Sequence, residues 1–91
     1  MKVSYTIEQD TNSSYLVTFP DIPEAVTVLY SLYSKDNVLI DCIETAFEMY
    51  ADNNRQFLAN YNLNNSYDVI KIPRRLKKAI KKHNLVARQN N

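Results

Sequence analysis

Four acidic residues are the side chains of this chain that could bind a catalytic metal ion. Asp10, Asp21 and Glu24 are expected in turns, and Asp68 is expected at the start of a strand. If they converged at one sheet, they would supply the several carboxylates that metal-dependent cleavage of nucleic acid requires. Zinc or thiol chemistry has no comparable basis, because the single cysteine and the single histidine stand apart from other ligands. A glycine-rich phosphate loop is excluded, since the chain contains no glycine.

The charge of the chain is divided between two segments, which indicates binding more than catalysis. Residues 1–70 contain three basic residues against all ten acidic residues, a net charge of −7. Residues 71–91 contain eight basic residues and no acidic one, a net charge of +8. Surfaces of such opposite sign predict two different partners.

The basic segment is predicted to be a helix over Arg74–Leu85, because Pro73 suits its first turn. Its thin apolar line is Leu76, Ala79 and Ile80, and residues 86–91 are expected to fray. It is interpreted as a phosphate-binding helix, as a solvated helix, or as one that docks on an acidic partner, which includes a second copy. The candidate nucleic-acid contacts are Arg74, Arg75, Lys77, Lys78, Lys81 and Lys82. The lone His83 on this helix is expected to be inert.

A second, longer helix is predicted from Ser31 or Ser34, either of which could cap it, to Asp52. Its apolar stripe recurs with helical spacing and consists of Leu39, Cys42, Ile43, Ala46, Phe47 and Tyr50. The opposite face carries Asp36, Asp41, Glu44, Glu48 and Asp52. That face is either simply solvated or a docking surface for a basic partner. One of Tyr30 and Tyr33, just before the helix, is expected to be exposed for partner contact.

The remaining elements are strands, so the predicted class is α+β. Strands are expected over Lys2–Gln9, Ser14–Phe19, Ala25–Leu29 and Tyr67–Ile72. They predict a three- to four-stranded, mainly antiparallel sheet covered by the long helix, with the basic helix at the C-terminal end. The first hairpin must turn at Asn12-Ser13 without glycine. A short helical turn is expected around Arg55–Tyr61, within the Asn-rich loop of residues 53–66.

One segment is more specific than the rest. After the strand Ser14–Phe19, Pro20-Asp21-Ile22-Pro23 must bulge or leave the sheet, because two prolines cannot both donate to a ladder. Strand formers then resume at Val26. Together with Ala46-Phe47-Glu48-Met49-Tyr50 and Tyr67–Pro73 in the same order, this break resembles the HicB family, the antitoxins of HicA–HicB toxin–antitoxin modules.

The resemblance implies a partial RNase H-like fold over residues 1–72, followed by a basic helix and tail over 73–91 that is not a separate domain. It implies a non-enzymatic protein without metal or cofactor, which binds and masks a HicA-type mRNA-cleaving toxin and assembles into dimers or tetramers. The implied partner contacts lie in the proline break and on the acidic helix face: Phe19, Asp21, Ile22, Pro23, Glu24, Asp41, Glu44 and Glu48.

The chain departs from the family pattern in three places. It has no glycine in the first hairpin, it carries Ala25 where many relatives have Gly-Cys, and it ends at Asn91 before a complete DNA-binding module. A second interpretation is therefore a solitary HicB-like protein of a phage or mobile element that acts on a host factor. A third is a small nucleic-acid-binding regulator that uses the basic helix as a dimer. The absence of a signal sequence or a long apolar run predicts a cytoplasmic protein without membrane contact.

Overall fold

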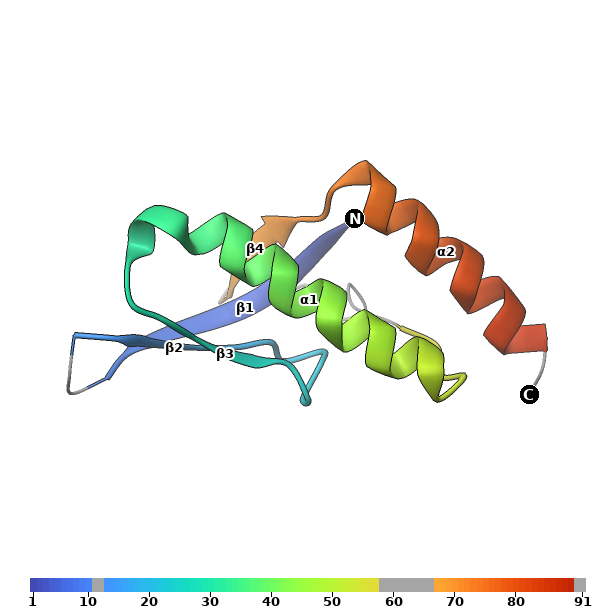
Figure 1. Cartoon of the computed structure of the whole chain (residues 1–91), viewed down its shortest axis with the longest axis horizontal. Coiled ribbons are helices and arrows are strands. Elements are labelled where there is room, and N and C mark those ends of the chain that lie inside the picture. Colours follow the sequence, from blue (N-terminus) through green and yellow to red (C-terminus); the bar gives the residue numbers. More distant parts are fainter. Residues whose placement is uncertain (11–12, 58–66, 90–91) are drawn as a thin grey trace.

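The computed structural model of the chain describes residues 1–10, 13–57 and 67–89 and has an α+β fold (Figure 1). Strands β1 (Lys2–Gln9), β2 (Tyr15–Thr18), β3 (Val26–Leu29) and β4 (Asp68–Lys71) form one sheet in the order β3-β2-β1-β4. All three pairings are antiparallel. The helical elements are a short 3₁₀ turn, η1 (Leu32–Ser34), and the helices α1 (Lys35–Asp52) and α2 (Arg74–Gln89). The predicted class and the antiparallel sheet are confirmed.

Strand β1 lies inside the sheet and pairs with β2 at one end and with β4 at the other. The pairing with β2 runs from Thr6↔Thr18 to Gln9↔Tyr15, and the pairing with β4 runs from Lys2↔Lys71 to Tyr5↔Asp68. Apolar side chains alternate along these strands as the period of two requires, so one face of the sheet is buried. Ser4, which alternates with Val3 and Tyr5 along β1, is 0% exposed, and its hydroxyl has no hydrogen-bond partner among the described residues.

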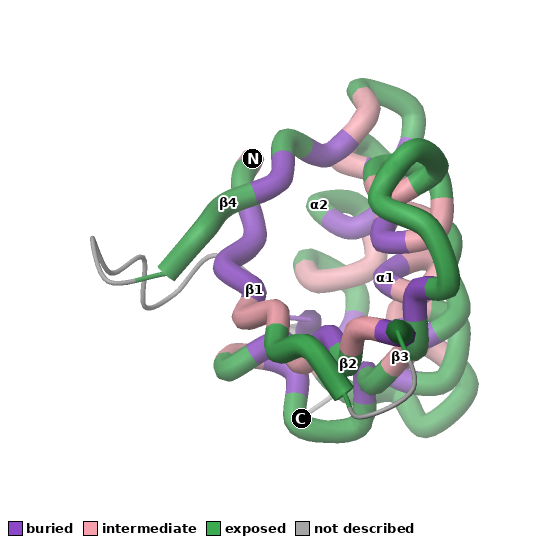
Figure 2. The backbone as a smooth tube through the Cα atoms, turned by 90° about the vertical axis from the view of Figure 1, so that its left-hand side faces the viewer, coloured by how far each residue is buried: buried purple, intermediate pink, exposed green. Residues whose placement is uncertain are grey.

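Both helices lie on the same side of the sheet (Figure 2). Helix α1 buries Leu39, Ile43, Ala46 and Tyr50, which confirms the predicted stripe, while Cys42 and Phe47 are half-buried at its margins. At the start of this segment Ser31, not Ser34, acts as a cap, because its hydroxyl accepts a hydrogen bond from the backbone N–H of Tyr33 at 3.2 Å.

Helix α1 ends in a left-handed turn that glycine usually makes. Asn54 has φ of 56°, and its N–H donates to the Ala51 carbonyl at 3.0 Å. The next N–H, of Arg55, donates to the Tyr50 carbonyl at 2.9 Å, which completes a Schellman motif. Asn is tolerated in this conformation better than most residues, so a chain without glycine can still reverse here. Ser13, with φ of 63°, serves the first hairpin in the same way.

Helix α2 packs beside α1, and its Leu76 and Ile80 are buried in the common core. The Asn84 side chain binds the backbone of Phe57 on both sides: Oδ1 accepts from the Phe57 N–H at 2.7 Å, and Nδ2 donates to the Phe57 carbonyl at 3.0 Å. Two predictions are wrong here. Ala79 is exposed, because the buried line continues from Ile80 to Ala87, and the helix runs to Gln89 instead of fraying from Val86.

The predicted helical turn around Arg55–Tyr61 lies partly outside the described residues. Its described part, residues 55–57, has an irregular backbone that is held by the contacts with α2.

The left-handed turn can be tested with two substitutions at one position. Asn54→Ala should lower the free energy of unfolding by about 1 kcal/mol, because alanine pays a steric cost at positive φ. Asn54→Gly should retain the wild-type stability or raise it, since glycine adopts this conformation freely. Urea denaturation followed by circular dichroism measures both variants, and equal stability of the two would contradict the role assigned to the turn.

Candidate functional site

The proline break between β2 and β3 folds into two successive turns. The Ile22 N–H donates to the Phe19 carbonyl and the Ala25 N–H donates to the Ile22 carbonyl, each at 2.9 Å. Phe19 and Ile22, both predicted to contact a partner, are each only 1% exposed, so they anchor the break in the core and offer little surface for that contact. Asp21 is half-buried, and Pro23 and Glu24 remain exposed.

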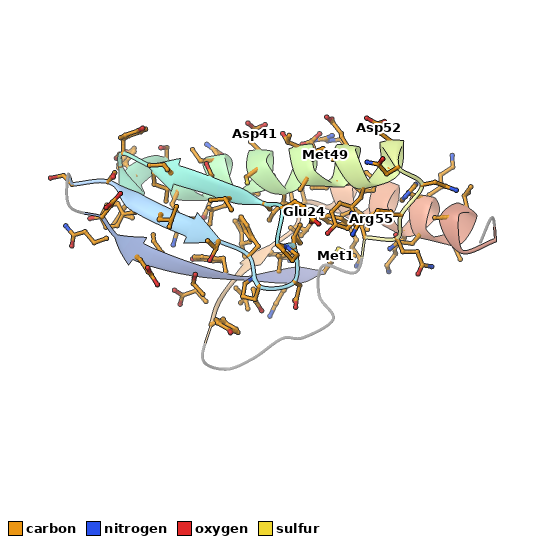
Figure 3. The ribbon with its side chains drawn as sticks, turned by 90° about the horizontal axis from the view of Figure 1, so that it is seen from below. Met1, Glu24, Asp41, Met49, Asp52 and Arg55 are labelled. Carbon is orange, nitrogen blue, oxygen red and sulfur yellow. The ribbon has the colours of Figure 1, made fainter. Side chains whose placement is uncertain are left out.

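Glu24 ties the proline break to the end of α1. The Tyr50 hydroxyl donates to Glu24 Oε2, and the Arg55 guanidinium lies 3.7 Å from Glu24 Oε1. Arg55 also stacks over the Tyr50 ring, with its Cζ 4.3 Å from the ring centroid. The Schellman turn at Asn54 makes this possible, because it sends Arg55 back along α1 toward Tyr50. Figure 3 shows Glu24 and Arg55 close together beneath α1.

The contacts among Glu24, Tyr50 and Arg55 shift the pKa values of the Glu24 carboxyl group and the Tyr50 hydroxyl group. The hydrogen bond from Tyr50, the Glu24 backbone N–H and the charge of Arg55 hold the pKa of Glu24 below its ordinary value of 4.5. Burial, and then the hydrogen bond to Glu24, raise the pKa of Tyr50. Glu24 is therefore a charged structural residue at neutral pH and only partly available to a partner.

The acidic face of α1, defined here as Asp41, Glu48 and Asp52, is exposed and forms no ion pair among the described residues. These residues are spaced by seven and four positions, which places them on one stripe of the helix. Figure 3 shows Asp41 and Asp52 on the same side of α1. Glu44, also predicted to contact a partner, instead lies 3.3 Å from Arg75 of α2 and is half-buried. That ion pair joins the two helices, so both Glu44 and Arg75 are already engaged.

The basic surface is larger than the sequence indicated. Arg74, Lys78, Lys81 and Lys82 are exposed on α2. Lys71 pairs directly with Lys2 across strands β4 and β1, a contact that the sequence alone could not reveal. Like charges directly opposite each other destabilise a sheet. Beside them is an open cavity of about 400 Å³, lined by Met1, Lys71, Ile72, Arg74 and Lys77. The basic surface is therefore defined by Lys2, Lys71, Arg74, Lys77, Lys78, Lys81 and Lys82.

The residues considered for catalysis do not form a constellation. No three His, Cys, Asp or Glu side chains come together as a metal site within residues 1–10, 13–57 and 67–89. Burial raises the pKa of the Cys42 thiol, which makes it a poorer nucleophile. His83 has a structural contact, because its Nε2 lies 2.7 Å from the Arg55 carbonyl and its ring packs edge-on against Phe47.

Comparison with models of known protein families gives no match, and comparison with curated proteins gives none either. In the part of the chain that is described, neither α1 nor α2 has the combination of length and apolar composition that a membrane span requires.

The Tyr50–Glu24 hydrogen bond predicts a pH-dependent effect on stability. Because the pKa of Glu24 is lowered in the folded state, its contribution is present above pH 4.5 and is lost as the pH falls through the lowered value. Tyr50→Phe should therefore be less stable than the wild type at pH 7, and the difference should narrow below pH 4.5. Thermal unfolding at several pH values measures this difference.

Tyr33→Phe is the matched control, because the Tyr33 side chain is 99% exposed and its hydroxyl is free to hydrogen-bond water. It should follow the wild-type curve at every pH. A constant offset for Tyr50→Phe from pH 7 to pH 3 would show that its hydroxyl does not interact with ionised Glu24.

Proposed function

We propose that this chain is an antitoxin-like binding protein that masks a basic, HicA-type mRNA-cleaving toxin with the acidic face of α1. The observation that carries the proposal is that Asp41, Glu48 and Asp52 form no ion pair among the described residues, on one stripe of a helix packed on a sheet. Three carboxylates on one stripe repel one another, and a cationic partner would relieve that repulsion. The sequence resemblance to HicB points to the same kind of partner.

The proposed partner suits this surface for a physical reason. HicA toxins resemble double-stranded-RNA-binding domains and cleave mRNA with a catalytic histidine, so their working surface is basic. An acidic face steers such a protein into contact and competes with RNA for the same surface. The exposed Tyr30 and Tyr33, beside the start of α1, supply aromatic side chains of the type that is enriched at binding hot spots.

Several finer features belong to the same proposal. They are a partial RNase H-like arrangement of residues 1–72, a non-catalytic role, a cytoplasmic location, and assembly into dimers or tetramers through a sheet edge. A solitary form encoded by a phage or mobile element, acting on a host toxin or another host protein, would use the same acidic face.

Growth rescue tests the masking proposal. Co-expression of the chain with candidate HicA-type toxins should restore growth for at least one of them. Reversal of the acidic face, by Asp41→Lys, Glu48→Lys and Asp52→Lys together, should abolish rescue and weaken binding of the purified toxin by more than about tenfold. Isothermal titration calorimetry measures the change in Kd.

The matched control reverses three charges on the other helix, by Lys78→Glu, Lys81→Glu and Lys82→Glu. This variant should still rescue growth, since these residues lie outside the acidic face. The proposal fails if no HicA-type toxin binds the chain. It also fails if the variant with the reversed acidic face rescues growth as well as the variant with reversed charges on α2.

Nucleic-acid binding by the basic surface is a second candidate function, favoured by the pairing of Lys2 with Lys71. Repulsion between two cations directly opposite each other in the sheet, beside Arg74 and Lys77, lowers the stability of the fold. Contacts with phosphate groups would offset that repulsion. This surface is separate from the acidic face, so the two functions can be tested independently.

Replacement of Lys71 should move stability and binding in opposite directions. Lys71→Glu should raise the free energy of unfolding by about 0.5 kcal/mol, because it replaces a repulsion across the strands with an attraction. It should also weaken binding to single-stranded RNA in fluorescence anisotropy, and the wild-type affinity should fall steeply between about 50 and 200 mM salt. Glu8→Gln, an exposed change elsewhere on β1, is the control. Salt-independent binding, or no binding by the wild type, would exclude this function.

A further inference from the structure

A groove lies between the edge strand β3 and helix α1, beside the acidic face. Its volume is about 230 Å³, and its walls are residues 24–27 on the sheet side and one stripe of α1 on the other. The helix wall consists of Val38, Asp41, Cys42, Thr45, Ala46 and Met49. These residues recur at alternating spacings of three and one, so they form a continuous surface along the helix. Figure 3 shows Met49 on α1 above Glu24.

The sheet side of the groove is an open strand edge. In the sheet formed by the described residues, β3 has one hydrogen-bonded neighbour, β2. Alternate residues of an edge strand direct their N–H and C=O groups outward, where another chain can pair with them. Addition of an extended segment to an edge strand is a recurrent mode of peptide recognition.

Apolar side chains at the groove are left in contact with solvent. Met49 of α1 is 51% exposed, and Val26 of β3, whose register places it on the face of the sheet away from α1, is 53% exposed. Cys42 and Val38 are half-buried on the same wall as Met49. A strand added to β3 would direct alternate side chains to the two faces of the sheet. Small apolar residues on one face would cover Val26 and Val28, and the intervening residues would point toward the α1 wall that carries Asp41.

The negative charge around the groove indicates which kind of molecule binds there. Asp41 lies in the groove wall, and Glu48 and Asp52 continue the same side of α1. A second copy of the chain is disfavoured, because pairing β3 with its own copy would bring two acidic faces together, and Val26–Leu29 carries no charge to compensate. A cationic segment satisfies the backbone edge, the apolar walls and the carboxylates together.

We propose that the groove between β3 and α1 binds an extended cationic segment of the partner protein, which adds to the β3 edge as a further strand. This inference rests on the proposed masking function and assigns its mode of contact. Backbone pairing gives the segment its register. Lysine or arginine side chains on the face toward α1 lie along the groove wall with their aliphatic stems and approach Asp41. The alternate apolar side chains lie on the other face of the sheet, beside Val26 and Val28. The sequence motif expected of the partner is an alternation of small apolar and basic residues.

A designed peptide tests the groove without a toxin. A fluorescein-labelled, end-blocked peptide of alternating lysine and valine should bind the full chain, whereas the corresponding glutamate–valine peptide should bind at least tenfold more weakly. The same lysine–valine peptide with alternate backbone nitrogens methylated should also lose at least tenfold, because it cannot pair with the strand edge. Fluorescence anisotropy measures the three Kd values.

Two substitutions in the groove test the contribution of its shape and the contribution of its charge to peptide binding separately. Thr45→Tyr places an aromatic ring in the groove and should weaken lysine–valine peptide binding by about tenfold, while Asp41→Asn should weaken it by less. Asp36→Asn is the matched control, because Asp36 is exposed on the same helix outside the groove and should bind like the wild type. Circular dichroism of each variant verifies that it is folded.

Hydrogen exchange gives a readout that charge attraction alone would not change. Peptide binding should slow the exchange of backbone amides within Val26–Leu29 and leave those of α2 unchanged. The inference is overturned if the methylated peptide binds as well as its parent, if Thr45→Tyr has no effect, or if these amides are not protected. It is also overturned if the chain dimerises and Thr45→Tyr makes it monomeric, since the occupant would then be a second copy.

Failure of this inference and failure of the masking proposal give different results. A toxin that binds and loses affinity on reversal of the acidic face, but is insensitive to Thr45→Tyr, leaves masking intact and removes the groove. If the lysine–valine peptide binds but no HicA-type toxin does, the masking proposal fails and the groove remains a binding site for cationic peptides.

Discussion

The left-handed turn at Asn54 is the constraint on which the arrangement of the surfaces depends. It ends α1 and reverses the chain, so that Arg55 stacks on Tyr50 and Phe57 packs edge-on against Tyr50 with ring centroids 5.1 Å apart. Arg55 then approaches Glu24 in the proline break, and the Phe57 backbone is held by Asn84 of α2. One residue at positive φ therefore connects the break, the long helix and the basic helix.

The positions of the charged surfaces follow from the buried ones. Because α1 must bury Leu39, Ile43 and Ala46 against the sheet, its orientation about its axis is fixed, and the carboxylates on the other side of the helix face solvent. Leu76 and Ile80 fix α2 in the same way. The Glu44–Arg75 ion pair lies where the two helices meet, and at this exposure it contributes little stability by itself. Apolar packing thus determines where the acidic face of α1 and the basic surface lie, and both surfaces remain available for partners.

Local patterns in the sequence were sufficient for most of the fold. Alternation predicted β1 with the bounds that the structure shows, and helical spacing predicted the buried stripe of α1 and its end at Asp52. The side chains that hold the elements together could not be predicted, because their partners are distant in sequence. Asn84 binds a backbone 27 residues away, and Tyr50 donates to Glu24 across 26 residues. The same limit applies to the site: the acids of α1 were recognised from their spacing, whereas the Lys2–Lys71 pair depends on strand register.

The central place of β1 also has a kinetic consequence for a chain synthesised from its N-terminus. Strands β1, β2 and β3 and helix α1 are contiguous in sequence and can associate early, but one half of β1 has no hydrogen-bonding neighbour until β4 arrives. Residues 68–71 must leave the ribosome before that gap closes, and α2 follows directly after them. During this interval Lys2–Tyr5 of β1 present an open backbone edge, which is the state most exposed to mispairing and aggregation.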